Sequence, residues 1–81
     1  MKYADGTIAE LGDRLDMGQG DTGIVVAIMD DGVYSEGFPQ EQWGFLKEGA
    51  LVDTSFGGLV HYDRFDDDLS IKLVSRASGR R

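Results

Sequence analysis

The chain has 81 residues and a formal net charge of −7, since 15 Asp and Glu residues stand against eight Lys and Arg residues. All 15 acids lie in residues 1–75, whereas residues 76–81 contain three arginines and no acid. This length allows one domain, and a body this acidic repels phosphate backbones, which argues against nucleic-acid binding.

Several residue types that define functional sites are absent or scarce. There is no cysteine, which excludes a disulfide framework and a thiolate zinc site, and the single histidine, His61, excludes any site that needs two imidazoles. The longest apolar run, 24–29, is far shorter than the roughly 20 residues of a membrane-spanning helix, and the first residues contain no apolar signal-peptide core. We therefore expect a cytoplasmic protein that does not enter a membrane.

Glycine divides the chain into short segments. Twelve of the 81 residues are glycine and one is proline. No stretch of about 11 residues or more combines a helical hydrophobic period with freedom from glycine. This spacing is typical of short strands joined by turns, so the sequence predicts an all-β fold.

Extended segments are predicted where apolar or alternating runs lie between turn residues, in chain order at 2–4, 7–10, 13–17, 22–29, 50–54, 59–62 and 69–74. Asp5-Gly6 is typical of a type I′ turn, which would join the first two segments as a hairpin. The continuous apolar run within 22–29 predicts a central strand buried on both faces, which ends at Asp30-Asp31-Gly32.

Residues 33–49 differ from the rest because they hold four of the eight aromatic residues. Pro39 is predicted at the first position of a short helical turn, with Phe38 packed over it. Gly44 and Gly49 keep this turn short.

Five or six short strands with one short helical turn predict a small SH3-like barrel, which we assign to residues 1–75 as a single domain. Closure or near closure of the sheet would limit its exposed edges. Residues 76–81 are predicted to form a disordered basic tail outside this domain.

Two short motifs resemble the first half of a KOW-type SH3-like barrel: Gly12-Asp13-Arg14-Leu15, and then the run from Gly20 to Val26. In that pattern a Gly-Asp pair opens one strand, and a glycine-flanked turn leads into a valine-rich strand. The acidic charge departs from that of ribosomal and elongation-factor KOW domains, so the resemblance implies the fold and puts RNA binding in doubt.

The remaining motifs resemble those of a group of small uncharacterised bacterial proteins. They are Tyr34-Ser35-Glu36, then Pro39 followed by Trp43-Gly44-Phe45-Leu46, and finally Gly58-Leu59 with His61-Tyr62. Proteins of this size and acidity are often immunity proteins paired with secreted bacterial toxins. The resemblance therefore implies a bacterial protein that neutralises a toxin.

The aromatic segment allows two interpretations. In the first, Tyr34, Phe38, Trp43 and Phe45 form a binding surface, because such side chains bury much area and anchor interfaces. In the second, the segment caps the end of the barrel and fills its core.

Acidic residues gather at Asp30-Asp31 and at Asp66-Asp67-Asp68, in loops that flank predicted strands. These loops are either solvated turns or a surface that faces a basic partner. No EF-hand spacing is present, so we predict no bound metal, and we predict no other cofactor. The predicted partner-binding residues are the aromatic and acidic ones together: Tyr34, Glu36, Phe38, Trp43, Asp30, Asp31, Asp66, Asp67 and Asp68.

Catalysis is not predicted. Counting residues along the predicted hairpin allows a catalytic triad of Ser55, His61 and Asp63, but no local sequence signature supports that arrangement. A histidine hydrogen-bonded to a neighbouring strand is the simpler interpretation.

We therefore expect a non-enzymatic module that binds a protein with a basic surface. Its most specific form is an immunity protein that occludes a toxin through the acidic loops and the aromatic segment. The alternative is an SH3-like adaptor whose aromatic groove binds an extended peptide. Neither interpretation involves nucleic acid or a membrane.

Overall fold

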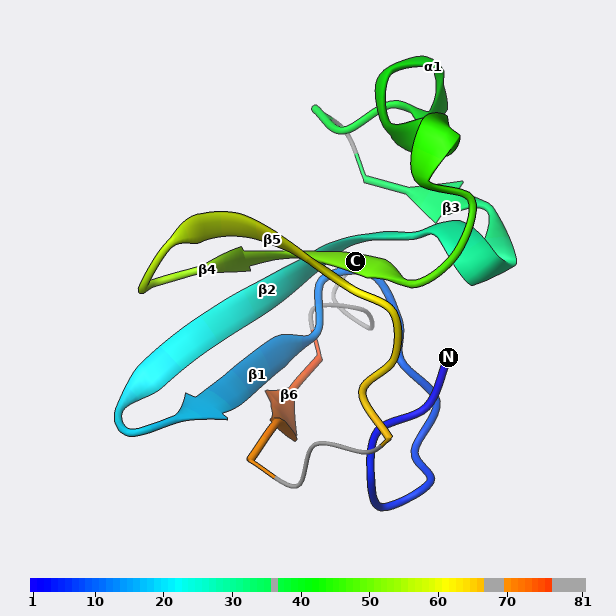
Figure 1. Ribbon diagram of the computed structural model, residues 1–81. Coiled ribbons are helices and arrows are strands. Elements are labelled where there is room, and N and C mark those ends of the chain that lie inside the picture. The colour runs from blue at the N-terminus through cyan, green and yellow to red at the C-terminus, as the bar shows by residue number, and fades with distance from the viewer. Residues whose placement is uncertain (36, 67–69, 77–81) are drawn as a thin grey trace.

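The computed structural model describes residues 1–35, 37–66 and 70–76. Within these residues six strands form one antiparallel sheet, accompanied by a short α-helix and two short 3₁₀ helices (Figure 1). The strands are β1 (Arg14–Gly18), β2 (Asp21–Ile28), β3 (Val33–Tyr34), β4 (Ala50–Thr54), β5 (Gly58–Tyr62) and β6 (Lys72–Ser75). The helices are η1 (Met29–Asp31), α1 (Gln40–Trp43) and η2 (Gly44–Leu46). The predicted all-β class with one short helical region is confirmed.

The strands are ordered β5-β4-β2-β1-β6 across the sheet, and β3 pairs with the end of β2. Strands β1, β2, β4 and β5 form an antiparallel meander, and β6 then returns to pair with β1. This order agrees with the SH3-like arrangement predicted from the sequence. No pairing joins β5 to β6 within the described residues, so these two strands are the edges of the sheet there.

Strand β2 holds the sheet together because β1, β3 and β4 all pair with it. Between β1 and β3 the edge of β2 is completed by the Gly12 N–H, which donates to the Val25 carbonyl (2.8 Å), and by the Ser35 N–H, which donates to the Val26 carbonyl (3.0 Å). The predicted burial on both faces is confirmed from Val25 onward. It is wrong for Ile24, which is exposed because the 33–46 segment covers only the later residues of its face.

One side of the sheet encloses the main core. Its buried residues come from the whole length of the chain: Tyr3, Ala9, Leu15, Val25, Ile28, Ala50, Val52, Phe65 and Ile71. The rings of Tyr3 and Phe65 stack with their centroids 5.3 Å apart. This stack joins the N-terminal segment to the segment that follows β5, and together they close the core.

The opposite side of the sheet carries a smaller buried cluster at the end of β2, made of Val26, Ala27, Met29 and Leu51. Since neighbouring residues of a strand point to opposite faces, Val26 and Leu51 lie on the other side of the sheet from Val25 and Val52 of the main core. Side chains of β3, α1 and η2 pack on this cluster, and Figure 1 shows these elements projecting beyond the sheet. We call this side the outer side.

The N-terminal hairpin differs from its prediction in the position of the turn. Its central residues are Ala4 and Asp5, and the Gly6 N–H donates to the Tyr3 carbonyl (2.9 Å). Gly6 has a φ of 91°, but Asp5 has a negative φ, so the turn is not type I′. The glycine instead follows the turn as a bulge, and one isolated bridge within residues 2–8 replaces the predicted strand pair.

Arg76, which the sequence predicts in the basic tail, contacts the folded body. Its guanidinium lies 2.7 Å from a Glu10 carboxylate oxygen and 3.4 Å from a carboxylate oxygen of Asp13. Residues 77–81 lie outside the described residues, so the disordered tail stays a prediction.

Candidate functional site

The predicted aromatic residues of the 33–46 segment cover the outer side of the sheet. Tyr34, Phe38 and Trp43 are each half-buried and pack on the cluster around Leu51. Strand β3 places Tyr34 there, and the helical turn after Pro39 places Trp43. These three side chains therefore act as a cap, and each keeps part of its surface exposed.

Phe45 is the most exposed aromatic residue among those described. Its side chain is 70% exposed and stacks on Trp43, with the ring centroids 6.5 Å apart and 25° between the ring planes. The short helix η2 presents Phe45, and Lys47, with a φ of 60°, then turns the chain back toward β4. A large apolar side chain held this far out of the core is typical of an interaction surface.

A row of outward-facing side chains crosses the sheet beside this segment. In the strand register Ile24 of β2 lies opposite Asp53 of β4, which lies opposite Leu59 of β5. Ile24 and Leu59 are each 38% exposed, and Asp53 is exposed between them. In the next row on the same face, the buried Leu51 lies opposite His61. Because Leu51 belongs to the cluster under the aromatic cap, the row of Ile24, Asp53 and Leu59 lies beside that cap on one side of the sheet.

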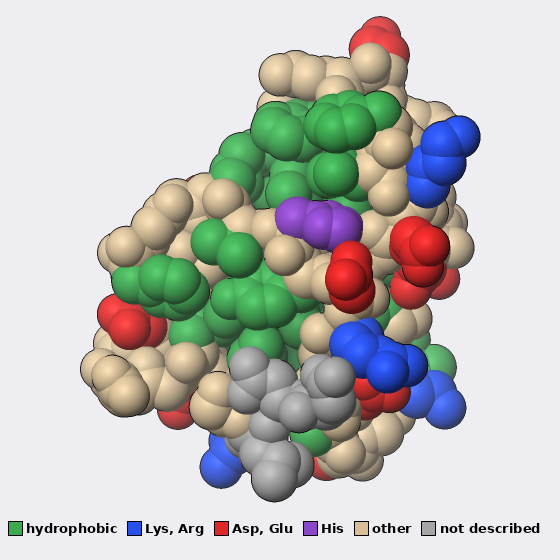
Figure 2. Space-filling model, in the orientation of Figure 1, with side chains coloured by type: hydrophobic (Ala, Val, Ile, Leu, Met, Phe, Trp, Pro, Cys, Tyr) green, Lys and Arg blue, Asp and Glu red, His purple; other side chains and the backbone are tan. Residues whose placement is uncertain are grey.

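We define the outer face as Ile24, Asp53, Leu59 and His61 together with Phe45. Figure 2 shows hydrophobic side chains above and below the histidine in that view. The Asp63 carboxylate lies near the histidine, with one oxygen 3.9 Å from its Nδ1, and the histidine Nε2 is 2.8 Å from the backbone carbonyl of Glu48. The face thus combines exposed apolar groups with nearby negative charge.

The predicted acidic residues have separate roles. Asp30 accepts a hydrogen bond from the Gly49 N–H (2.9 Å), which ties η1 to the start of β4, and Asp66 pairs with Arg64 (3.2 Å). Asp31 is exposed and has no hydrogen bond or ion pair with a described residue. The remaining three predicted residues lie outside the described residues: Glu36, Asp67 and Asp68.

Sequence reasoning missed Asp53. It is an exposed acid in a strand, and its side chain has no hydrogen bond or ion pair to the part of the chain that the structure describes. The signal available in the sequence was an aspartate inside the predicted strand 50–54, a position that strands disfavour.

The structure does not place Ser55 in a triad with His61 and Asp63. The Ser55 hydroxyl accepts a hydrogen bond from the Thr22 N–H (3.0 Å) and lies 3.4 Å from an Asp21 carboxylate oxygen, so its contacts are with β2. His61 instead contacts the backbone carbonyl of Glu48, in the segment before β4, and not a neighbouring strand as the simpler interpretation predicted. Gly49 allows this contact, because a Cβ there would lie only 2.9 Å from the imidazole and 2.2 Å from the Tyr62 carbonyl oxygen.

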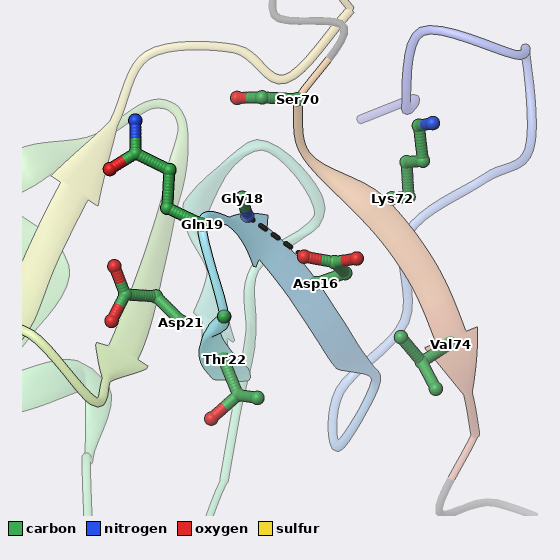
Figure 3. Close-up of a pocket in the computed structure, with 9 residues that line it drawn as sticks. Asp16, Gly18, Gln19, Asp21, Thr22, Ser70, Lys72 and Val74 are labelled. Atoms are coloured by element: carbon green, nitrogen blue, oxygen red, sulfur yellow. Dashed lines mark hydrogen bonds between the residues drawn. The ribbon is translucent and has the colours of Figure 1, made fainter.

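An open hollow of about 460 Å³ lies at the β1–β2 turn, against β6 (Figure 3). The Asp16 carboxylate at its centre accepts a hydrogen bond from the Gly18 N–H (2.8 Å). The side chains of Asp21 and Lys72 point away from Asp16 in Figure 3. Its polar groups do not converge on one point, so we assign no ligand to this hollow.

A second polar cluster, Tyr3, Glu10, Asp13 and Arg76, is closed to solvent at its centre. Asp13 is fully buried, and one of its oxygens accepts hydrogen bonds from the Tyr3 hydroxyl (2.6 Å) and the Glu10 N–H (2.9 Å). The other oxygen has no hydrogen bond among the described residues, and the Arg76 Nε lies 3.4 Å from it. We call this group the Asp13 cluster. It joins the N-terminal hairpin, β1 and the end of β6, so its role is structural.

The Tyr3 phenol shows how enclosed this cluster is. Burial raises its pKa well above the usual value of 10.0, and the hydrogen bond to the Asp13 carboxylate raises it further. The phenol therefore stays protonated and acts as a permanent hydrogen-bond donor.

Two further observations concern the described residues only. Their His, Asp and Glu side chains form no group of three that could hold a metal ion. None of their helices has the length and hydrophobicity needed to cross a membrane.

Comparisons with family models, with curated proteins and with solved structures find no match for this chain. Function is therefore inferred from the site, because a fold by itself does not determine function.

Proposed function

We propose that this protein is a non-enzymatic module that binds a protein with a basic surface. The observation that supports the proposal is the outer face, where exposed Phe45, Ile24 and Leu59 lie with Asp53, a carboxylate that has no partner among the described residues. Exposed apolar side chains bordered by charge mark interaction surfaces on proteins.

Charge contributes to the rate of this binding, and apolar surface contributes to its affinity. The net charge of −7 speeds encounter with a basic surface, and added salt weakens that attraction. Phe45 and the aliphatic residues of the outer face then lose contact with water, which supplies most of the affinity. The protein acts by covering its partner's surface, so it needs no catalytic group and no cofactor.

The most specific form of the proposal is an immunity protein that occludes a bacterial toxin in the cytoplasm. Its support is the resemblance of two motifs, Tyr34-Ser35-Glu36 and the run from Pro39 to Leu46, to small bacterial proteins of this kind. A toxin that acts on nucleic acid or nucleotides has a basic active site, and an acidic face suits such a site.

Co-expression with a toxin encoded beside the gene tests this function. We expect growth to be restored, and we expect Phe45→Ala to abolish the rescue while the protein stays folded. Val74→Ala is the matched control, because Val74 is a similarly exposed apolar residue (64%) on β6, away from the outer face. Absence of a neighbouring toxin gene, together with failure to neutralise any co-expressed toxin, would reject the immunity function.

An SH3-like adaptor that binds extended peptides is the second candidate. The observation that favours it is the edge position of β5, since an open sheet edge accepts a peptide as an added strand. A peptide array separates the two candidates. Several unrelated short ligands would support the adaptor, whereas binding to one folded partner alone would support the immunity protein.

A further inference from the structure

Asp53 occupies an unusual position for an aspartate, inside a β-strand between two aliphatic residues. It lies opposite Ile24 on one side and opposite Leu59 on the other. Directly paired residues have Cβ atoms about 4.5–5.5 Å apart on the same face, so the carboxylate is flanked by two apolar side chains. Strands disfavour aspartate, so the stability of the sheet does not explain this residue.

Asp53 also differs from the other aspartates in described strands because no described residue pairs with its side chain. Asp16 accepts a hydrogen bond from the Gly18 N–H (2.8 Å), and Asp21 lies within hydrogen-bond distance of the Ser55 hydroxyl (3.4 Å). The Asp53 side chain makes no hydrogen bond or ion pair with any residue that the structure describes. Its charge is therefore available to another molecule.

Arg14 is the cation that extends the same row on the far side of β2. It pairs in register with Ile24, which places it two strands, or about 10 Å, from Asp53. No ion pair joins the two side chains, and at this separation Arg14 leaves the Asp53 carboxylate without a counterion in contact.

We propose that Asp53 binds an arginine side chain of the partner protein, with the arginine stem lying on Ile24 and Leu59. Arginine fits this position better than lysine because its guanidinium offers two parallel N–H donors to one carboxylate and is more weakly hydrated. The apolar neighbours exclude water from the pair and strengthen it. This inference rests on the proposed function, since it names the group of the partner that the outer face receives.

Two blocked tripeptides, Leu-Arg-Leu and Leu-Lys-Leu, serve as probes in an NMR titration of the full chain. We expect the arginine peptide to shift the backbone amides of Ile24, Asp53 and Leu59 and to bind about three-fold more tightly than the lysine peptide. Asp53→Asn should remove this difference. Glu41→Gln, which removes the same charge from an exposed residue of α1 whose side chain has no hydrogen bond or ion pair with a described residue, should leave it intact.

Equal binding of the two peptides would overturn the proposal. Equal effects of Asp53→Asn and Glu41→Gln would also overturn it, because binding would then depend on net charge alone. Light scattering tests a second copy as the occupant: a concentration-dependent dimer that Asp53→Asn abolishes would assign the outer face to self-association and reject the partner's arginine.

The chain's own terminal arginines are a further alternative occupant. If Arg80→Gln with Arg81→Gln moves the Asp53 amide signal in the absence of peptide, the carboxylate binds this chain's own arginines and the proposal is wrong. An unmoved signal leaves the site to the partner, as proposed.

The toxin co-expression assay separates this inference from the function on which it rests. If Phe45→Ala prevents neutralisation and Asp53→Asn does not, the proposed function stands and the arginine contact is rejected. If the arginine peptide binds at Asp53 but no neutralisation is found, the contact is supported and the immunity function is rejected.

Discussion

Asp13 and Asp53 are carboxylates of one small sheet protein in opposite surroundings. Asp13 is fully buried and accepts hydrogen bonds from the Tyr3 hydroxyl (2.6 Å) and the Glu10 N–H (2.9 Å). Asp53 is exposed and has no partner among the described residues. A buried charge persists only where the fold supplies donors, whereas an exposed one is free to meet another molecule. The first aspartate therefore serves stability, and we assign the second to recognition.

Aromatic residues show the same division between the two sides of the sheet. Phe65 is completely buried and stacks on Tyr3 in the main core, whereas Phe45 stands on the outer side and is 70% exposed. Trp43 lies between these extremes, because one side of its ring covers the sheet cluster and Phe45 stacks on it.

The largest effect is expected at the Asp13 cluster. Asp13→Ala should destabilise the protein by about 3 kcal/mol, because it leaves the Tyr3 hydroxyl without its acceptor and Arg76 without its buried partner. Urea denaturation measures this loss. Asp53→Ala is the matched control and should stay within about 0.5 kcal/mol of the original protein. Equal losses of stability in the two variants would contradict the assignment of Asp13 to stability and Asp53 to recognition.

The next effect contrasts the two stacked aromatics. Trp43→Ala should cost about 2 kcal/mol of folding stability, because this partly buried ring packs on the Leu51 cluster. Phe45→Ala should cost less than about 0.5 kcal/mol of stability but weaken partner binding about ten-fold. Denaturation and binding measurements on both variants test this, and a large stability loss at Phe45 would show that it belongs to the cap.

A smaller effect is expected from removing the Tyr3 hydroxyl. Tyr3→Phe should cost about 1 kcal/mol at neutral pH, because one hydrogen bond to Asp13 is lost. The pKa of Tyr3 is raised in the fold, chiefly by burial, so the folded protein keeps a proton that the unfolded chain releases near the usual value of 10.0. This contribution is therefore fully present below about pH 10 and is lost as the pH rises above that value.

Denaturation midpoints measured from neutral to alkaline pH test the sign of this dependence. The original protein should lose stability above about pH 10, and Tyr3→Phe should lose less over the same interval. A decline of the same steepness in both proteins would assign the alkaline loss to other groups.

The smallest effect compares two arginines that pair with acids. Arg76→Gln should cost about 0.5–1 kcal/mol, because Arg76 joins β6 to the N-terminal hairpin through a partly buried pair. Arg64→Gln should change stability by less than about 0.3 kcal/mol, since the Arg64 and Asp66 side chains are both largely exposed. Equal losses of stability in the two variants would show that Arg76, within the Asp13 cluster, stabilises the fold no more than an exposed ion pair does.

Most strands were predictable because the signals for them are local. The prediction of 50–54 matches β4, the prediction of 22–29 is shifted by one residue from β2, and 59–62 begins one residue later than β5. Alternation of side chains and the glycines at turns act over a few residues, so a single sequence reveals them. The N-terminal turn was misplaced because Gly6 suits both a type I′ turn and the bulge after a type I turn.

The candidate site was less predictable because exposure depends on what packs over each element. The sequence pointed to the aromatic segment, but it did not separate Phe45 from Trp43, since both suit a core and a surface. Strands disfavour aspartate, but the sequence alone does not show which residues lie beside Asp53 or that its side chain is exposed. Its significance comes from Ile24 and Leu59, which become its neighbours only when β2, β4 and β5 pair.

By itself, the sequence determined the all-β class, most strand positions and the net charge of −7, because these follow from local patterns or from composition. Only the tertiary structure decided which acids are neutralised and which apolar residues remain exposed. The contact of Arg76 with Glu10 spans 66 positions of the chain, and no local pattern predicts it. Burial and ion pairing depend on such distant contacts, and they distinguish Asp13, held by the fold, from Asp53, which we propose is left for a partner.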